Sequence, residues 1–482
     1  MSGAGAALPP PRLTVRGGPG GTAARLDDLE AAAGRLRDAA AAMAWVAVRV
    51  ARVTADPALL AAGVRHPLAW WDVEHRLAGA TAGRDGALTV AARYAALAAA
   101  ALAVVTLYRT TEAGVDAAVR AADTAAGEAV GRLFGLPVLA AAAVTAPVLA
   151  ASGASVRPFA RSVAVAVAAH PDGLEHGVDA APGALRGVLS ASPLLRVLAG
   201  AGTLCPLGVP REVAGAAGWL GAVGRTTPWL REGDVVVHPG SVIVAAPPRG
   251  IADLLTGVSH LDPDRGGRPG AVQVLSVRRD GRRAWVVQIP GTQEWSPRPG
   301  RNPFDLTGDV HGLAGERTAG GRAVTAALRA AGAGPGEPVL LVGHSQGGIV
   351  AAQLAADPQF RRSFTVTHVV TAGSPVATAR IPPSVSVLSL EHEHDVVPRL
   401  DGRPNPDRAG WITVSAPAER PGAPVDPAGS HDADAYVRTA AAVDASVDPG
   451  LRQWRAGLAP FLAGDGATGT RMTVSAERAG RS

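Results

Sequence analysis

A serine, an aspartate and a histidine, the side chains that together carry out acyl transfer, follow one another in the last third of the chain. Ser345 occupies the middle of a Gly-x-Ser-x-Gly pentapeptide over 343–347, between the apolar run 338–342 and the apolar stretch 349–354. A strand that enters a helix through such a turn forms a nucleophile elbow, in which glycines leave room and the hydroxyl stands clear of the sheet. With 59 glycines the pentapeptide alone is weak evidence, so its strand and helix context carries the prediction.

A second candidate lies upstream of the elbow. The strand-like run 284–289 ends in Pro290-Gly291-Thr292. A strand that ends in Gly-Thr before a nucleophile elbow is placed to line the hole that receives a developing oxyanion. The alternative is that Thr292 only caps a loop.

A third candidate is the cluster of acidic residues and histidines that follows the strand-like run 385–390, with the sequence Glu391-His392-Glu393-His394-Asp395. His392 and His394 alternate on one face and could bind a metal, although no other His-rich segment completes a site. The cluster could also be a solvated strand end.

These motifs resemble one family. Gly291-Thr292 with Trp295 three residues later, together with the elbow, is similar to the oxyanion segment of class 3 (fungal-type) lipases in the α/β-hydrolase superfamily. The resemblance implies that the backbone N–H groups of Thr292 and Gln346 hold the oxyanion, often with help from the threonine hydroxyl.

The same resemblance names an acid and a base. Asp395, followed by Pro398, resembles the lipase segment that carries the acid of the triad, with Asp401 and Asp407 as alternatives. His431, just ahead of a predicted helix, resembles the loop that carries the catalytic base. The order serine, acid, histidine is that of α/β hydrolases.

The resemblance implies a serine hydrolase that cleaves lipid or other acyl esters without a cofactor or a metal. A second hypothesis is a binding module with a silent triad, in which the helical half of the chain works as a secretion adaptor or a membrane-contacting bundle. Trp219-Leu220-Gly221 resembles the turn of helical hairpins handled by type VII secretion, but nine tryptophans among 59 glycines account for it by chance.

The order of strand-like and helical segments around these residues predicts an α/β fold. Strand-like runs over 271–277 and 284–289 flank Asp280-Gly281, which indicates a hairpin. Further strands over 338–342, 364–371 and 385–390 alternate with helices, the pattern of a parallel sheet whose site lies at the carboxyl ends of its strands. We predict an α/β-hydrolase domain over 227–463, with disordered segments over 1–20 and 464–482.

Residues 21–226 are Ala-rich and predict a separate all-α bundle. Its first helix has an apolar seam at spacings of three and four, and Asp56-Pro57 predicts the start of a second helix. Two more helices are predicted over 88–109 and 112–133. The seam consists of Leu26, Leu29, Ala33, Leu36, Ala40, Met43, Ala47 and Val50.

The composition of the chain bears on whether it contacts a membrane or nucleic acid. Residues 133–156 carry no charge and are long enough to cross a membrane, but Pro137 and Pro147 interrupt them, so both a bundle core and a membrane contact remain open. The net charge of +5 and the lack of basic runs with aromatics argue against nucleic acid. No basic and apolar leader begins the chain, which predicts a cytoplasmic protein by default.

Overall fold

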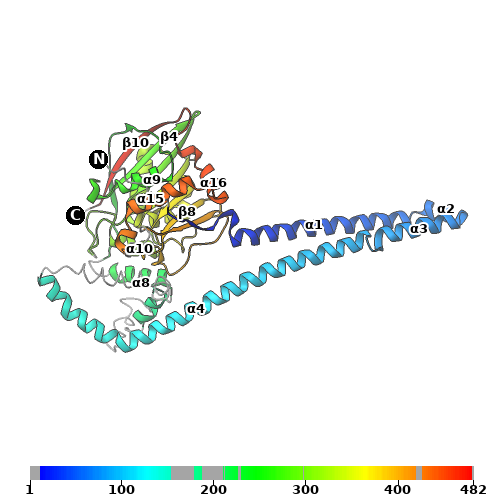
Figure 1. The fold of residues 1–482 in the computed structure, drawn as a ribbon, viewed down its shortest axis with the longest axis horizontal. Coiled ribbons are helices and arrows are strands. Elements are labelled where there is room, and N and C mark those ends of the chain that lie inside the picture. The colour runs from blue at the N-terminus through cyan, green and yellow to red at the C-terminus, as the bar shows by residue number, and fades with distance from the viewer. Residues whose placement is uncertain are drawn as a thin grey trace, which may run out of the picture. The chain divides into compact units, whose positions relative to one another are not determined.

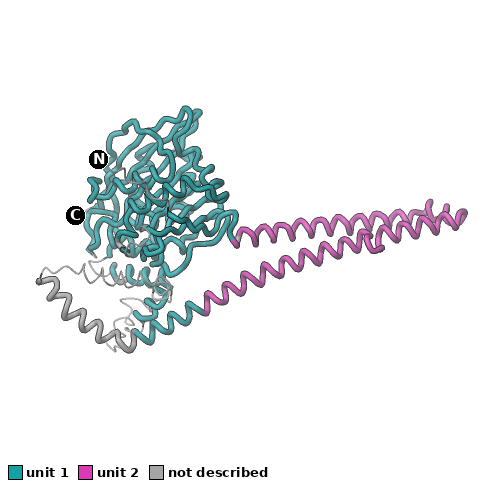
Figure 2. Tube along the Cα trace, viewed as in Figure 1, with its two compact units in different colours: residues 1–21, 119–482 teal, residues 22–118 magenta. Residues whose placement is uncertain are grey.

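The computed structural model describes residues 11–152, 178–186, 210, 212–225, 230–296, 298–418 and 426–479, without the side chains of 23, 131–152, 223, 225 and 427–428. The chain divides into two compact units (Figure 2). One unit is Thr22–Ala118, and the other joins Met1–Gly21 to Val119–Ser482. Each unit is described by itself.

The larger unit is organised around a sheet that contains ten strands among the described residues (Figure 1). Their order is β1-β9-β8-β7-β6-β5-β4-β10-β2, and β3 pairs with β10. The strands are β1 (Thr14–Gly17), β2 (Val235–Pro239), β3 (Ile243–Val244), β4 (Ala271–Arg279), β5 (Arg282–Ile289), β6 (Pro338–His344), β7 (Thr365–Ala372), β8 (Ser386–His392), β9 (Trp411–Ala416) and β10 (Thr468–Arg478).

Strands β5 to β9 are parallel to one another, as the alternation of strands and helices predicts. The central strand β6 buries both of its faces completely from Val339 to Val342. That continuous apolar run is what a parallel strand covered by helices requires. The β4–β5 hairpin turns at Asp280 and Gly281, both with positive φ, as predicted.

Helices cover both faces of the sheet. One apolar cluster joins β6 to α11 and α12, and a second joins it to α9, α15 and α16. From residue 213 on, the α-helices among the described residues are α8 (Val213–Arg225), α9 (Ile251–Ser259), α10 (Leu306–Leu313), α11 (Ala319–Ala331), α12 (Gln346–Ala356), α13 (Pro358–Ser363), α14 (Pro427–Ser430), α15 (Ala433–Ala445) and α16 (Pro449–Ala456).

Both segments predicted to be disordered contribute strands. Within 464–482, β10 pairs with β4 over eight residues and buries Met472, Val474 and Ala476. These three alternate with less buried residues, which is the period-2 pattern of a strand. Within 1–20, β1 pairs with β9 from Thr14 to Gly17. The prediction of disorder was therefore wrong for residues 14–20 and 464–479, whereas the predicted boundary near residue 226 falls on residues outside the described ranges.

The smaller unit is a long helical hairpin with a folded tip. Its helices are α1 (Thr22–Thr54), α2 (Pro57–Arg65), α3 (Pro67–Ala82) and the first part of α4 (Ala87–Ser152). Asp56 caps α2 by accepting from the N–H groups of Ala58 and Leu59, as Asp56-Pro57 predicts. Arg109 on α4 forms ion pairs with Asp27 and Glu30 on α1, at 2.7 and 3.0 Å.

One helix replaces the two predicted over 88–109 and 112–133. The expected cap of the second helix, Thr111, lies inside the continuous helix α4, where the neighbouring Thr110 hydroxyl donates to the carbonyl of Thr106 at 2.9 Å. Among the described residues, the helical stretch Pro67–Val130 is long and apolar enough to cross a membrane by length and composition. The side chains of the predicted apolar stretch 133–156 lie outside the described residues.

Candidate active site

Ser345 sits between the end of β6 and the start of α12 with φ 54° and ψ −125°. A non-glycine residue in this region is strained, and the surrounding backbone holds it there. Its N–H donates to the carbonyl of Ala372 at 2.9 Å. A Cβ at Gly343 would lie 2.1 Å from the carbonyl carbon of Gly347, and a Cβ at Gly347 would lie 2.3 Å from the carbonyl oxygen of Ile289. Both glycines are therefore required for the turn.

The structure brings His431 and Asp395 to this serine. Nε2 of His431 lies 3.0 Å from Oγ of Ser345, and Nδ1 of His431 lies 2.8 Å from Oδ2 of Asp395. Asp395 follows β8, and His431 stands between α14 and α15. Residues separated by 86 positions thus form one hydrogen-bonded chain at the carboxyl ends of the strands.

Asp395 is a buried carboxylate with three donors. Besides His431, it accepts from the hydroxyl of Tyr436 at 2.7 Å and from the N–H of Val397 at 2.9 Å. Burial works to raise the pKa of Asp395, but His431 and the two other donors outweigh it and hold that pKa below its usual value. At Gly373, where φ is 59°, a Cβ would lie 2.9 Å from Oδ2 of Asp395, so a side chain here would crowd the acid.

His392 supports the loop that carries His431. Its Nδ1 lies 2.6 Å from the carbonyl oxygen of Ser430, and its Nε2 lies 2.8 Å from Oγ1 of Thr439. The ring stacks on Tyr436 with centroids 3.8 Å apart. With both nitrogens engaged, His392 is not available to a metal, and no group of three or more His, Cys, Asp and Glu residues in the described ranges could hold one.

His344, the residue before the serine, also contacts the base. Its Nε2 lies 2.9 Å from the carbonyl oxygen of His431, and the two rings lie 4.7 Å apart. Burial lowers the pKa of His344 to about 3, so the ring is neutral and its Nε2–H donates to that carbonyl. The pentapeptide therefore supplies a donor that fixes the backbone of the base.

The two predicted oxyanion residues flank the serine. A Cβ at Gly291 would lie 3.2 Å from Cβ of Ser345, which places the Gly291-Thr292 loop against the elbow. The hydroxyl of Thr292 donates to the carboxyl group of Asp309, with distances of 3.1 and 2.9 Å to its two oxygens. Gln346 begins α12, and its side-chain amide donates to the carbonyl of Asp305 at 2.6 Å. These bonds leave the backbone N–H groups as the candidate oxyanion donors.

Asp309 is a site residue that the sequence did not reveal. Burial raises its pKa to about 7, and Asp305 adds to the rise, whereas the bonds to Thr292 and Gln346 and the nearby His431 lower it. Asp309 lies in the first turn of α10, where an acidic residue is ordinary, so nothing in the sequence separated it from a capping residue.

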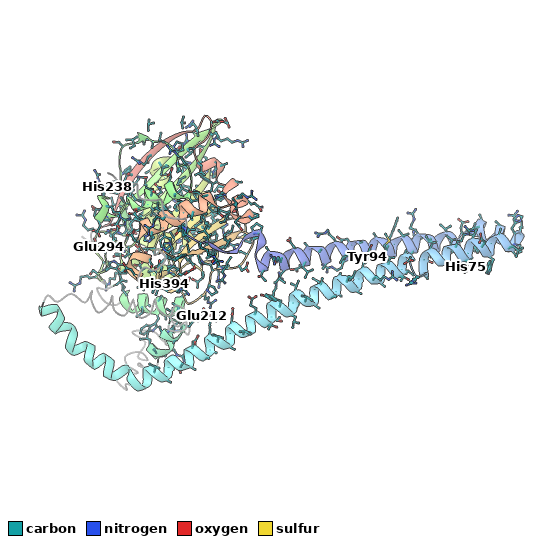
Figure 3. All side chains as sticks on the ribbon, in the orientation of Figure 1. His75, Tyr94, Glu212, His238, Glu294 and His394 are labelled. Atoms are coloured by element: carbon teal, nitrogen blue, oxygen red, sulfur yellow. The ribbon has the colours of Figure 1, made fainter. Side chains whose placement is uncertain are left out.

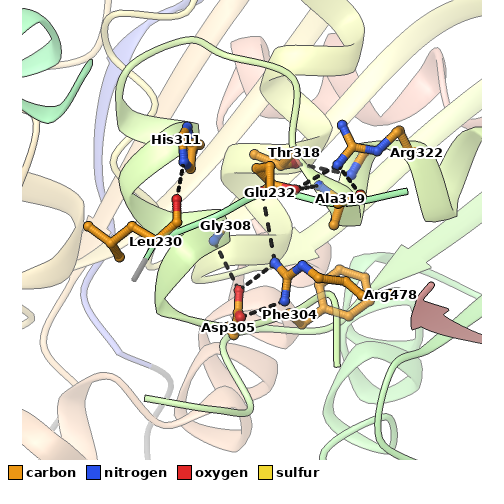
Figure 4. Close-up of polar contacts among 12 residues, drawn as sticks. Leu230, Glu232, Phe304, Asp305, Gly308, His311, Thr318, Ala319, Arg322 and Arg478 are labelled. Carbon is orange, nitrogen blue, oxygen red and sulfur yellow. Dashed lines mark hydrogen bonds and ion pairs between the residues drawn. The ribbon is translucent and has the colours of Figure 1, made fainter. Parts of the chain in front are cut away.

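A buried ion pair ties the C-terminal strand to this wall of the site (Figure 4). Arg478 on β10 donates to both carboxylate oxygens of Asp305, at 2.6 and 2.8 Å. Asp305 in turn caps α10 by accepting from the N–H of Gly308 at 3.1 Å. Glu232 lies beside them and accepts from Arg322 at 2.7 Å and from the N–H of Ala319 at 2.8 Å.

A large cavity lies away from the serine. It measures about 1380 Å³, and its walls include Gln353 on α12 and Asp357 after it. Ser345, His431 and Asp395 do not line this cavity, so its size carries no information about their substrate.

Residues 325–415 match the family model of the PGAP1-like alpha/beta domain. The match spans 91 of 482 residues, counted from 325 to 415, and it contains Ser345 and Asp395 but ends before His431. This part of the chain has an α/β-hydrolase-like fold. The match is consistent with a hydrolase in general, and no curated protein or solved structure matches the chain significantly.

Proposed function

We propose that the protein is a serine hydrolase that cleaves carboxylic esters through an acyl-enzyme. The observation that carries the proposal is the unbroken chain from Oγ of Ser345 through His431 to Asp395, with both hydrogen bonds at 3.0 Å or less. A serine hydroxyl is a weak nucleophile, and a neighbouring histidine held by a carboxylate activates it. The strained elbow around Ser345 adds support, because such strain gathers at functional sites.

The chemistry follows from this arrangement. His431 takes the proton of Ser345 at Nε2 while Oγ attacks the ester carbonyl, and the carbonyl oxygen becomes an oxyanion. The N–H groups of Thr292 and Gln346 stabilise that oxyanion. The intermediate collapses when His431 returns its proton to the leaving alcohol, which leaves an acyl group on Ser345. Water then repeats the sequence, and a carboxylic acid departs.

The lipid or acyl class of substrate rests on the resemblance of the Gly291-Thr292 and Asp395 segments to class 3 lipases. Hydrolysis of 4-nitrophenyl esters with two to sixteen acyl carbons tests both parts of the proposal. We expect turnover by the full chain, a preference for acyl chains longer than acetyl, and loss of turnover in Ser345→Ala. A folded full-length protein that cleaves none of the esters would contradict the enzyme and favour a binding module with a silent triad.

A further inference from the structure

The helical hairpin buries its smallest side chains. The seam between α1 and α4 contains Ala33, Ala40 and Ala47 on one helix, and on the other Ala91, Ala98 and Val105. Each set repeats every seven residues, which is the period of helices that supercoil around one another. Alanine in the seam lets the two backbones approach closely but removes little apolar area from water.

A second apolar stripe runs beside this seam on both helices, and it is not covered within the unit. It also repeats every seven residues, and its exposed members include Val46, Leu97 and Val104, at 40, 57 and 56% exposure. On α1 the stripe contains Leu29, Leu36, Met43 and Val50, flanked by Val46 and Val53, which are also seven residues apart. On α4 it contains Val90, Leu97 and Val104, with Tyr94 and Tyr108 beside them. Figure 3 labels Tyr94 where α4 runs along α1.

The two stripes lie on one face of the hairpin. With about 100° of rotation about the helix axis per residue, the exposed stripe on each helix is rotated away from the buried seam in the same sense, toward the angles of earlier residues. Because α1 and α4 run in opposite directions, the same rotational direction on both helices leads to the same face. The ion pairs of Arg109 with Asp27 and Glu30 lie on the other rotational side of the seam, which agrees with a polar opposite face.

We propose that this face is the dimer interface with a second copy of the chain, whose hairpin completes a four-helix bundle. A second seam of heptad period is what a helix needs when it packs against helices on two sides. A lipid surface demands no such period. From residue 29 to residue 53 the stripe is about 36 Å long at the helical rise, and two helices give a width of roughly 20 Å. Two such faces bury about 1,400 Å², which is the size of a stable interface.

Two of the three charges on the outer edge of α1 are complementary between two copies, and the third, Arg35, has Ala42 at the facing position. Asp28 and Arg49 are exposed and lie on the same outer edge of α1, at opposite ends of the stripe. In one chain they stand about 32 Å apart along the helix, which is too far for attraction. A two-fold axis through the middle of the stripe brings Asp28 of each copy to Arg49 of the other, and it stacks Leu36 on Met43.

The mass of the full-length protein between 1 and 50 µM, measured by sedimentation or light scattering, tests the proposal. We expect a dimer whose dissociation constant rises about 100-fold or more in Leu97→Glu. Ala99→Glu is the matched control, because Ala99 is exposed two residues away on the opposite face, and it should leave the dimer intact. Circular dichroism must show that both variants keep their helix content.

Charge exchange makes the test specific for two copies. Asp28→Arg or Arg49→Asp alone should weaken the dimer about threefold to tenfold, and the two changes together should restore it. A wild-type protein that stays monomeric at 50 µM would overturn the proposal. So would a dimer that Leu97→Glu does not weaken. Pelleting of the monomer with phosphatidylglycerol vesicles, if Leu97→Glu abolished it, would assign the face to a lipid surface instead.

Discussion

In the sheet-bearing unit, β6 buries Val339, Leu340 and Leu341 completely, whereas in the hairpin the buried positions of α1 are all alanines, Ala24, Ala33, Ala40 and Ala47. Large apolar side chains such as Leu68, at 87% exposure, remain outside in the hairpin. A packed α/β core defines one arrangement of its polar residues, and here it holds a serine, a histidine and an aspartate within hydrogen-bond distance. The hairpin instead carries an apolar stripe that repeats every seven residues and that the rest of this unit does not cover. The difference teaches that catalysis should depend on the first unit and association on the second.

The largest expected effect tests the first half of this contrast. Ser345→Ala and His431→Ala should each reduce kcat by a similar factor of about 10⁴ or more, and the double variant should lose little beyond either single change. Asp395→Asn should cost less. Leu97→Glu on the hairpin is the control and should leave kcat on a short soluble ester within about twofold. If the factor lost in the double variant equalled the product of the two single losses, Ser345 and His431 would not act as one catalytic unit.

The next effect concerns the strand that joins the sheet to the wall of the site. Arg478→Met leaves the carboxylate of Asp305 buried without its cation, so unfolding should become easier by about 3–5 kcal/mol in urea titrations. Arg471→Met is the matched control, because Arg471 lies on the same strand but is partly exposed, and its cost should stay within about 0.5 kcal/mol. Equal stability of both variants would mean that the buried pair does not secure α10.

Core substitutions compare the two units directly. Leu340→Ala removes a fully buried side chain from β6 and should lower the free energy of unfolding by about 2–5 kcal/mol. Leu68→Ala changes a side chain that is already in water and should lie within about 0.5 kcal/mol of wild type. Chemical unfolding followed by tryptophan fluorescence measures both. A large cost at Leu68 would show that the tip of the hairpin is covered.

The smallest effect is a pH dependence of stability. Burial raises the pKa of Asp309 to about 7, so the folded state holds a proton that the unfolded state releases near pH 4. The contribution of Asp309 to the free energy of unfolding is therefore present at low pH and is lost as the pH rises toward 7. Asp401 and Glu391 shift in the same direction, so the comparison must isolate Asp309.

In Asp309→Asn the free energy of unfolding should depend less on pH. Relative to wild type, it should rise by on the order of 1–3 kcal/mol between pH 5 and pH 8. Urea titrations at both pH values measure this. An unchanged difference between the two proteins at pH 5 and pH 8 would place the titration elsewhere.

The elbow and the parallel sheet could be predicted because their signals are local. A buried apolar run, glycines and a serine stand within about a dozen residues, and strand order follows the alternation of helices and strands. The structure brings together the predicted Ser345, Asp395 and His431. The match over 325–415 supports the hydrolase-like fold but not the finer likeness to class 3 lipases, which stays a proposal.

What the sequence did not reveal depends on distant partners. Arg478 pairs with Asp305 across 173 positions, and the strand that carries it looked like a polar tail because every second residue is polar. Asp309 is an ordinary first-turn acid until folding brings Thr292 to it. In the hairpin, α4 runs without interruption through Thr110 and Thr111, so the predicted break between 109 and 112 does not occur.

Labelling with a fluorophosphonate, followed by peptide mass spectrometry, tests the central claim most directly. The reagent forms a covalent bond to a serine oxygen only where that oxygen is activated as a nucleophile. We expect one modified residue, Ser345, in the full-length protein, with strongly slowed labelling in His431→Ala and none in Ser345→Ala. A folded protein that takes up no label, or takes it up on another residue, would contradict the account.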